Sequence, residues 1–224
     1  MKNPNFITPI LLLILVFVLS SCKGDSNEND KQNTETDNKT DTIKTETTEE
    51  NFELEEIKMD DSKYEPAPDS VRHALNDLFD SYVALCMALS YSNPVQAQGN
   101  GTMFKKYLKL VDDKYLVGKG ALADWKDYSE KLNSLSTHIE TVPDLGTQRK
   151  SLSEFSKLMF NVVKRYGLFD KDAYLFLCST ALDGEGGYWM SETQDIINPF
   201  GESFKSCGKV IEHIEKIPLK KIGK

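Results

Sequence analysis

Two cysteines near the C-terminus, Cys178 and Cys207, are the residues of this sequence that could form a covalent or a metal-binding centre. Both lie in an irregular segment that follows the predicted helices. Outside the cytoplasm, paired cysteines usually oxidise, and a disulfide that closes a loop of about 30 residues stabilises a fold by roughly 3–4 kcal/mol. The alternative is a soft-metal site, because thiolate and thioether sulfur suit Cu(I). On these residues alone, both interpretations stay open.

A third cysteine, Cys22, follows a short apolar segment at the N-terminus. The unbroken apolar run Ile10–Leu19 rises about 15 Å as a helix, half of a ~30 Å hydrocarbon core, so it predicts a signal sequence and not a membrane span. Leu19-Ser20-Ser21-Cys22 is typical of a bacterial lipobox. We therefore expect residues 1–21 to be removed and Cys22 to be acylated, with an ordinary secretory signal as the alternative.

Acylation of Cys22 would determine where the protein resides. Two acyl chains give stable anchoring, whereas a single chain is marginal. The sequence thus predicts a cell-envelope protein bound to the lipid bilayer through the acyl chains of Cys22. The outer membrane is the expected membrane, and the choice between its periplasmic and its surface side stays open.

Residues 22–66 have the composition of a disordered, acidic tether. From position 23 to Lys63 there are fourteen Asp and Glu against six Lys and few apolar residues, whereas the remainder of the chain is close to neutral. Such a segment buries too little apolar surface to offset its chain entropy. The near-neutral remainder has no basic stripe, which argues against nucleic acid as a partner. We expect one domain over residues 67–217 and a short tail over residues 218–224.

Apolar residues at three- and four-residue spacing predict four amphipathic helices with short connections. The expected helices run from an N-cap at Asp69 or Ser70 to Tyr91, over Val95–Val111, over Ala121–Thr141, and from Leu145 to a terminating Gly167. This pattern favours an all-α fold, an antiparallel four-helix bundle. The segment Ala173–Cys178 predicts a short buried strand inside a small irregular C-terminal cap.

Two glycines and the fourth cysteine add local expectations. Gly99 and Gly101 fall in the second predicted helix, where each costs about 1 kcal/mol relative to Ala, so the first half of that helix is expected to fray.

Cys86 lies on the apolar face of the first predicted helix. We expect it to be a buried free thiol.

No catalytic signature is found in the sequence. It lacks Gly-x-Ser-x-Gly, His-Glu-x-x-His and P-loop patterns. His73, His138 and His213 form no ligand-spaced pair with one another. We therefore expect a non-enzymatic binding domain, with Cu(I) as the one cofactor to consider.

Short motifs in the C-terminal segment resemble those of a known family. They are Cys178-Ser179-Thr180-Ala181, Gly187-Tyr188-Trp189-Met190-Ser191, Ile197-Asn198-Pro199-Phe200-Gly201 and Cys207-Gly208-Lys209-Val210. In this order they resemble the bacterial domain of unknown function numbered 3347, which is common in Bacteroidetes. The resemblance spans about Ser70 to Ile214; the motif block is its specific part, and the helices match only in pattern.

The resemblance implies a link with copper or heavy-metal efflux, because this family occurs as lipoproteins and fused to periplasmic adaptor subunits of such pumps. Its typical block carries two methionines beside the cysteines, whereas Thr180 and Phe204 stand at those positions here. Met190 is the remaining thioether that could join Cys178 and Cys207 around Cu(I). Because both family methionines are absent, a disulfide between the two cysteines is the favoured state.

Two functions follow as hypotheses. In the first, a tethered envelope lipoprotein binds a metal ion or assists a metal-efflux or other envelope protein. In the second, the domain is a disulfide-stapled protein-interaction module that has lost metal binding.

Overall fold

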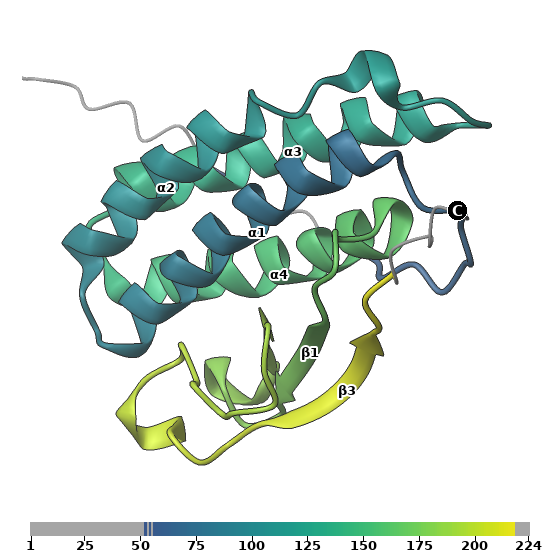
Figure 1. The fold of residues 1–224 in the computed structure, drawn as a ribbon. Helices are drawn as coiled ribbons and strands as arrows, with labels where there is room; N and C mark the ends of the chain where they lie inside the picture. The colour runs from purple at the N-terminus through teal and green to yellow at the C-terminus, as the bar shows by residue number, and fades with distance from the viewer. Residues whose placement is uncertain (1–51, 53, 55, 218–224) are drawn as a thin grey trace, which may run out of the picture. The chain divides into compact units, whose positions relative to one another are not determined.

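The computed structural model describes residues 52, 54 and 56–217, which fold as four helices followed by a three-stranded antiparallel sheet (Figure 1). The helices are α1 (Asp69–Ser90), α2 (Pro94–Leu108), α3 (Ala121–Thr141) and α4 (Leu145–Tyr166), and the strands are β1 (Ala173–Cys178), β2 (Gly187–Ser191) and β3 (Lys209–Ile214). Single turns of 3-10 helix occupy Asp113–Tyr115, Leu182–Gly184 and Glu202–Phe204. Within these described residues, no helix combines the length and the apolar character needed to cross a bilayer. The predicted signal segment, Cys22 and the tail over residues 218–224 lie outside the described residues.

The four helices pack in chain order, and the fourth also packs on the first. The prediction of four helices is confirmed, and α3 has the predicted bounds. As predicted, α4 ends before Gly167, whose φ of +78° suits a residue without a side chain. The second helix is shorter than expected, since it ends at Leu108 and not at Val111. Apolar side chains from the helices and from the sheet form one continuous core.

The start of α1 differs from the prediction. Pro68 occupies the N-cap position, and Asp69 and Ser70 are already helical. The Asp69 carboxylate instead accepts a 2.6 Å hydrogen bond from Nη2 of Arg72, a buried residue. Nη1 of Arg72 donates to the carbonyl oxygen of Leu168 at 3.1 Å. Asp69 therefore neutralises a buried guanidinium, a role that local sequence cannot distinguish from capping.

The C-terminal segment forms a sheet with strand order β2-β1-β3, in which both pairs are antiparallel. The predicted strand Ala173–Cys178 is confirmed as β1, whereas the all-α fold class is wrong. The two flanking strands give weak sequence signals. Strand β2 is only five residues long and begins with a glycine, and β3 exposes Lys209, Glu212 and His213. Charged residues are usual on edge strands because they prevent further pairing.

A chain of buried hydrogen bonds joins the sheet to the helices. Ser156 Oγ donates to the carbonyl oxygen of Leu152 at 2.7 Å, so its proton is used and it accepts from the Tyr82 hydroxyl at 2.6 Å. The Tyr82 oxygen in turn accepts from the Met190 N–H at 3.0 Å. Helices α1 and α4 and strand β2 therefore share one satisfied polar connection inside an apolar core.

The folded part begins before residue 67, the predicted domain boundary. Phe52, Leu54 and Ile57 pack against the core, and the N–H of Ala67 donates to the carbonyl oxygen of Tyr166 at 2.8 Å. The structure thus differs from the prediction of a disordered tether up to residue 66. Apolar residues in the last part of the predicted tether, among them Phe52, Leu54, Ile57 and Met59, are the sequence signal for this difference.

The two glycines of α2 have different surroundings. A Cβ on Gly101 would lie 3.0 Å from the carbonyl oxygen of Ser136 in α3, and Ser136 Oγ donates to the carbonyl oxygen of Gly101 at 2.8 Å. A Cβ on Gly99 would meet nothing within 4 Å. Helix α2 continues through both positions, so the expected fraying is not observed. Gly101 allows α2 and α3 to approach closely, whereas Gly99 has no such role.

Gly101→Leu and Gly99→Leu should therefore change stability in opposite directions. We expect Gly101→Leu to lower the free energy of unfolding by about 1–3 kcal/mol, because the side chain would be forced against the α3 backbone. Gly99→Leu should raise it by about 0.5–1 kcal/mol, because Leu favours a helix over Gly. Urea unfolding followed by far-UV circular dichroism measures both. Equal losses at the two positions would contradict this assignment.

Candidate functional site

The disulfide predicted from the sequence is present. Cys178, at the end of β1, is bonded to Cys207, in the loop before β3, and their Cα atoms are 5.3 Å apart. Cys178 is buried and Cys207 is partly buried. Both sulfurs therefore take part in a covalent link between the central strand of the sheet and the loop that leads to β3.

Asn198 shapes the loop that carries Cys207. Its Nδ2 donates to the carbonyl oxygen of Cys207 at 2.7 Å, and its Oδ1 accepts from the N–H of Phe200 at 2.7 Å. The N–H of Cys207 donates to the carbonyl oxygen of Phe204 at 2.8 Å. The buried Asn198 side chain thus fixes the backbone that presents Cys207 to Cys178.

Trp189 packs beside the loop that carries Cys207. We call this connection between β2 and β3, residues 192–208, the disulfide loop. Its ring stacks on Phe176 with centroids 4.9 Å apart and meets Phe200 edge-on at 6.1 Å. A Cβ on Gly208 would lie 2.7 Å from Cη2 of Trp189, so this glycine lets the backbone cross the indole ring. Trp189 is therefore a core residue of the sheet face that carries the disulfide.

Met190, the third predicted metal ligand, lies on the opposite face of the sheet from Cys178. It pairs in register with Leu175, so these two side chains share a face. Leu175 and Cys178 are an odd number of residues apart along β1, and side chains alternate between faces along a strand. The structure therefore brings Cys178 and Cys207 together but does not bring Met190 to them.

The residues at the disulfide do not fit a copper site. The two sulfurs are bonded to each other, and Oγ1 of Thr180 lies 3.6 Å from Sγ of Cys178 and 3.5 Å from Sγ of Cys207. A hydroxyl is a hard ligand and suits Cu(I) poorly, and Phe204 offers no donor atom. In the part of the chain that the structure describes, no group of three or more His, Cys, Asp and Glu could hold a metal ion.

Each histidine contacts a residue outside its own helix or strand: His73 packs on Phe169, His138 contacts Ser151, and His213 contacts Asp172. Burial lowers the pKa of His138, which favours its neutral form. The hydrogen bond from His213 lowers the pKa of the Asp172 carboxyl. These contacts connect elements of the fold and form no ligand set.

Cys86 is a free and buried thiol, as predicted. Burial raises its pKa to about 12, which outweighs the opposing effect of a hydrogen bond with Tyr82. Because the thiolate is the reactive form, Cys86 is inert near neutral pH.

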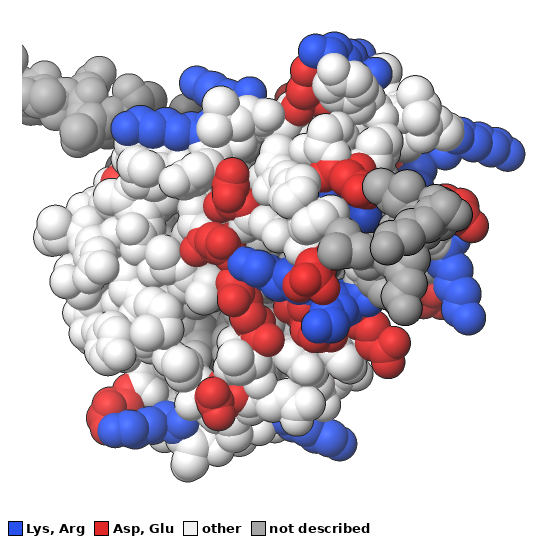
Figure 2. All heavy atoms as spheres, in the orientation of Figure 1, with Lys and Arg blue, Asp and Glu red and all other residues white. Residues whose placement is uncertain are grey.

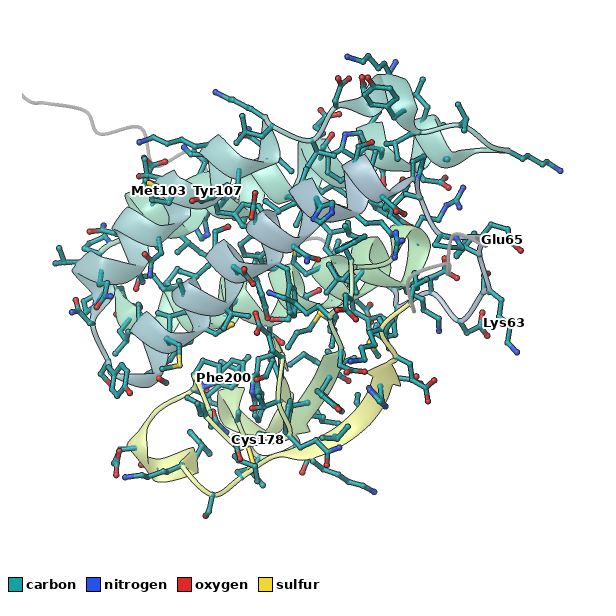
Figure 3. The ribbon with its side chains drawn as sticks, in the orientation of Figure 1. Lys63, Glu65, Met103, Tyr107, Cys178 and Phe200 are labelled. Carbon is teal, nitrogen blue, oxygen red and sulfur yellow. A yellow bond between two sulfur atoms is a disulfide. The ribbon has the colours of Figure 1, made fainter. Side chains whose placement is uncertain are left out.

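An uncharged surface around the connection between α1 and α2 was not recognised from the sequence. No Asp, Glu, Lys, Arg or His occurs from Ser81 to Phe104. Figure 2 shows no charged side chain on the surface at the left of the view, where α1 connects to α2 in Figure 1. Tyr91 and Val95 are 73% and 74% exposed, and Met103, labelled on α2 in Figure 3, is 41% exposed. Depletion of charge together with exposed aromatic and Met side chains is typical of the centre of protein–protein interfaces. The charge-free run was the signal that could have revealed it.

Arg149 of α4 links the end of α1 to the disulfide loop. Its Nη2 donates to the carbonyl oxygen of Leu89 at 2.9 Å and to Oγ of Ser92 at 3.0 Å, and its Nε donates to the carbonyl oxygen of Pro199 at 2.8 Å. Burial lowers the pKa of Arg149. The guanidinium lies against Gly201, where a Cβ would be 3.2 Å from Nη1. One side chain thus holds the uncharged surface and the disulfide loop in a fixed arrangement.

The family resemblance predicted from the sequence is confirmed. Residues 78–171 match the family model described as Protein of unknown function (DUF3347). The matched segment begins inside α1 and ends just before β1, so it covers most of the helical part. The motif block from Cys178 to Val210, predicted to be the specific part of the resemblance, lies outside it. No curated protein and no solved structure matches the chain.

Reduction of the Cys178–Cys207 bond should destabilise the domain. We expect the free energy of unfolding to fall by about 2–4 kcal/mol, because the reduced chain gains conformational freedom when unfolded. Urea unfolding with and without reductant measures this loss. The reductant should have no effect on a Cys178→Ala/Cys207→Ala variant and its full effect on Cys86→Ala. A wild-type protein that is insensitive to reductant would contradict the structural role of the bond.

Proposed function

We propose that this protein is a disulfide-stapled, non-enzymatic interaction module anchored to a membrane of the cell envelope through Cys22. The Cys178–Cys207 disulfide carries the proposal, because it uses the two predicted metal ligands in a structural bond. Such bonds persist in oxidising compartments and are rare in the cytoplasm. A stable disulfide is therefore consistent with the envelope location that the lipobox predicts.

The uncharged surface is the observation that favours protein binding over metal binding. In this proposal the four helices act as an antiparallel bundle, a rigid support that presents the α1–α2 connection with Tyr91 and Val95 exposed. Arg149 holds the disulfide loop beside it, so the disulfide supports the geometry of the surface. Metal handling or efflux rests on the family resemblance alone, since Met190 and Thr180 supply no copper site with the cysteines.

Thiol alkylation of protein extracted from the envelope tests the proposal. Without reductant, the native protein should gain no alkyl group, because Cys86 is buried with its pKa raised to about 12. The unreduced but denatured protein should gain one group, and the reduced and denatured protein should gain three. Intact-mass spectrometry counts these groups and detects the acyl mass on Cys22.

Two outcomes would contradict the proposal. One alkyl group more than expected under each of the three conditions would show that Cys22 is not acylated. Three alkyl groups on the unreduced, denatured protein would show that Cys178 and Cys207 are thiols in the envelope. In that case, stoichiometric Cu(I) binding that is lost in the Cys178→Ser/Cys207→Ser variant would favour metal handling instead.

A further inference from the structure

An extended segment lies along α3 and α4. We call it the strap and define it as Phe52, Leu54 and residues 56–60. Phe52 stacks on the ring of His138 from α3 with centroids 4.0 Å apart. The N–H of Ile57 donates to Oε2 of Glu154 from α4 at 2.9 Å. The strap thus contacts both helices, and it has no regular secondary structure of its own.

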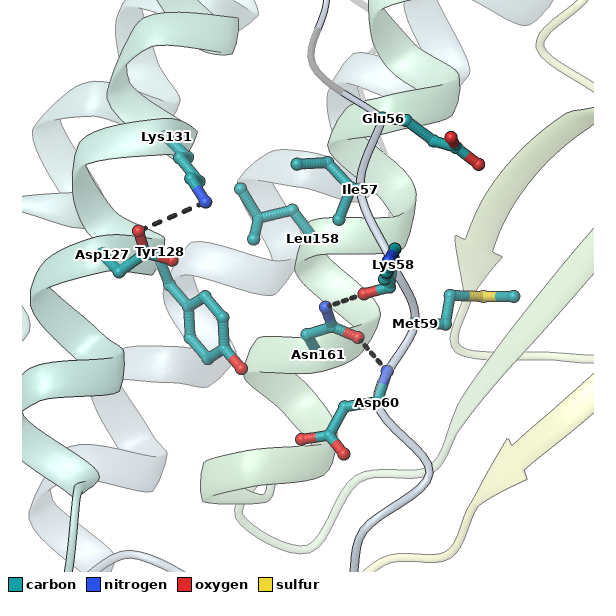
Figure 4. Close-up of a pocket in the computed structure, with 10 residues that line it drawn as sticks. All are labelled: Glu56, Ile57, Lys58, Met59, Asp60, Asp127, Tyr128, Lys131, Leu158 and Asn161. Carbon is teal, nitrogen blue, oxygen red and sulfur yellow. Dashed lines mark hydrogen bonds and ion pairs between the residues drawn. The ribbon is translucent and has the colours of Figure 1, made fainter.

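Asn161 of α4 binds the backbone of the strap at two points. Its Oδ1 accepts from the N–H of Asp60 at 2.8 Å, and its Nδ2 donates to the carbonyl oxygen of Lys58 at 2.8 Å (Figure 4). Asn161 is itself buried. Because these bonds involve only main-chain atoms of the strap, another extended peptide could form them equally well.

The groove between α3 and α4 is wider than the strap fills. A cavity of about 440 Å³ remains beside the strap, bounded on the helix side by Tyr128, Leu158 and Asn161 among others. Figure 4 shows the ring of Tyr128 pointing into this space. Burial raises the pKa of Tyr128 to about 12, so its hydroxyl stays a neutral donor. A volume in this range is typical of ligand clefts.

The charged residues that line the groove are mostly paired within the domain. Lys131 forms an ion pair with Asp127 at 3.2 Å, and Lys157 forms one with Glu154 at 2.8 Å. Both carboxylates line the same cavities as the lysines. The backbone hydrogen bonds of Asn161 and the apolar contacts of the strap therefore define the ligand, and charge does not.

We propose that the groove between α3 and α4 is a binding site for an extended peptide with bulky apolar side chains, and that the strap occupies this site in cis. The ligand is such a segment of a partner protein. This inference rests on the proposed function as an interaction module and adds a peptide site to it. Release of the strap would also free the chain N-terminal to it, which connects the domain to the predicted anchor.

Peptide binding to a variant with a weakened strap tests the inference. A tethered segment acts at an effective concentration in the millimolar range, so the wild-type strap should exclude a free peptide. In the full chain, Phe52→Ala/Ile57→Ala removes two apolar contacts of the strap and keeps the groove. A fluorescent peptide with the sequence of residues 50–62 should bind this variant saturably in an anisotropy titration, and should bind the wild-type chain at least about tenfold more weakly.

Asn161 provides the specific control. Asn161→Ala, added to the weakened-strap variant, should reduce peptide affinity about tenfold, because two hydrogen bonds are lost. Asn133→Ala, at an exposed position of α3, should leave the affinity unchanged. A peptide methylated on the backbone nitrogen of its Asp60 position should also bind about tenfold more weakly, without any change to the protein.

Three results would overturn the inference. The first is the absence of saturable peptide binding to a weakened-strap variant that keeps its far-UV circular dichroism. The second is equal peptide affinity of the wild-type chain and that variant. The third is a peptide affinity that backbone methylation does not change. These results would leave the thiol and acyl counts unchanged, so failure of the peptide site is distinguishable from failure of the proposed function.

Discussion

The Tyr82 hydroxyl is the interaction on which the arrangement of the domain depends. It donates to Ser156 on α4 and accepts from the Met190 N–H on β2. The Tyr82 ring, which belongs to α1, is buried in the apolar core. Burial holds the pKa of Tyr82 well above its usual value, so the hydroxyl remains a neutral donor and acceptor. A buried N–H without a partner is destabilising, and this bond therefore fixes the sheet on the helices at one position.

Helix α4 forms similar polar contacts with several of its neighbours. It packs on α1, α2, α3 and β2. Ser153 Oγ accepts from the N–H of Tyr188 at 3.2 Å, and Asn161 binds the strap. Each of these pairs defines one position of the neighbouring element, because a shifted element would leave a buried polar group unpaired. The disulfide then closes the loop on the far side of the sheet.

The sequence was sufficient where a pattern was local and strong. The apolar periodicity predicted α3 and α4 with their bounds, and the buried run predicted β1. The two cysteines alone left a disulfide and a metal site open, and the absence of the methionines of the resembled family favoured the disulfide that is present. Strands β2 and β3 could not be predicted in the same way. Their pairing with β1 depends on contacts distant in sequence, and the charges of the edge strand β3 resemble those of a loop.

The strap and the separation of Met190 from the two cysteines show a second limit of sequence reasoning. Phe52, Leu54 and Ile57 are outnumbered by acidic residues in the segment up to Lys63, so the composition of that segment predicted a disordered tether. Asn161 falls on the polar side of the predicted helix, where sequence alone indicates solvent. The position of Met190 relative to Cys178 depends on the register of β1 and β2, which no local pattern in the sequence defines.

Tyr82→Phe tests most directly whether the hydroxyl connects the three elements. The substitution keeps the ring and removes the acceptor of the Met190 N–H, so we expect the free energy of unfolding in urea to fall by about 1–3 kcal/mol. In a double-mutant cycle with Ser156→Ala, the two losses should not add, because both substitutions interrupt the same chain of hydrogen bonds. A loss within about 0.5 kcal/mol of zero, or full additivity with Ser156→Ala, would contradict this account.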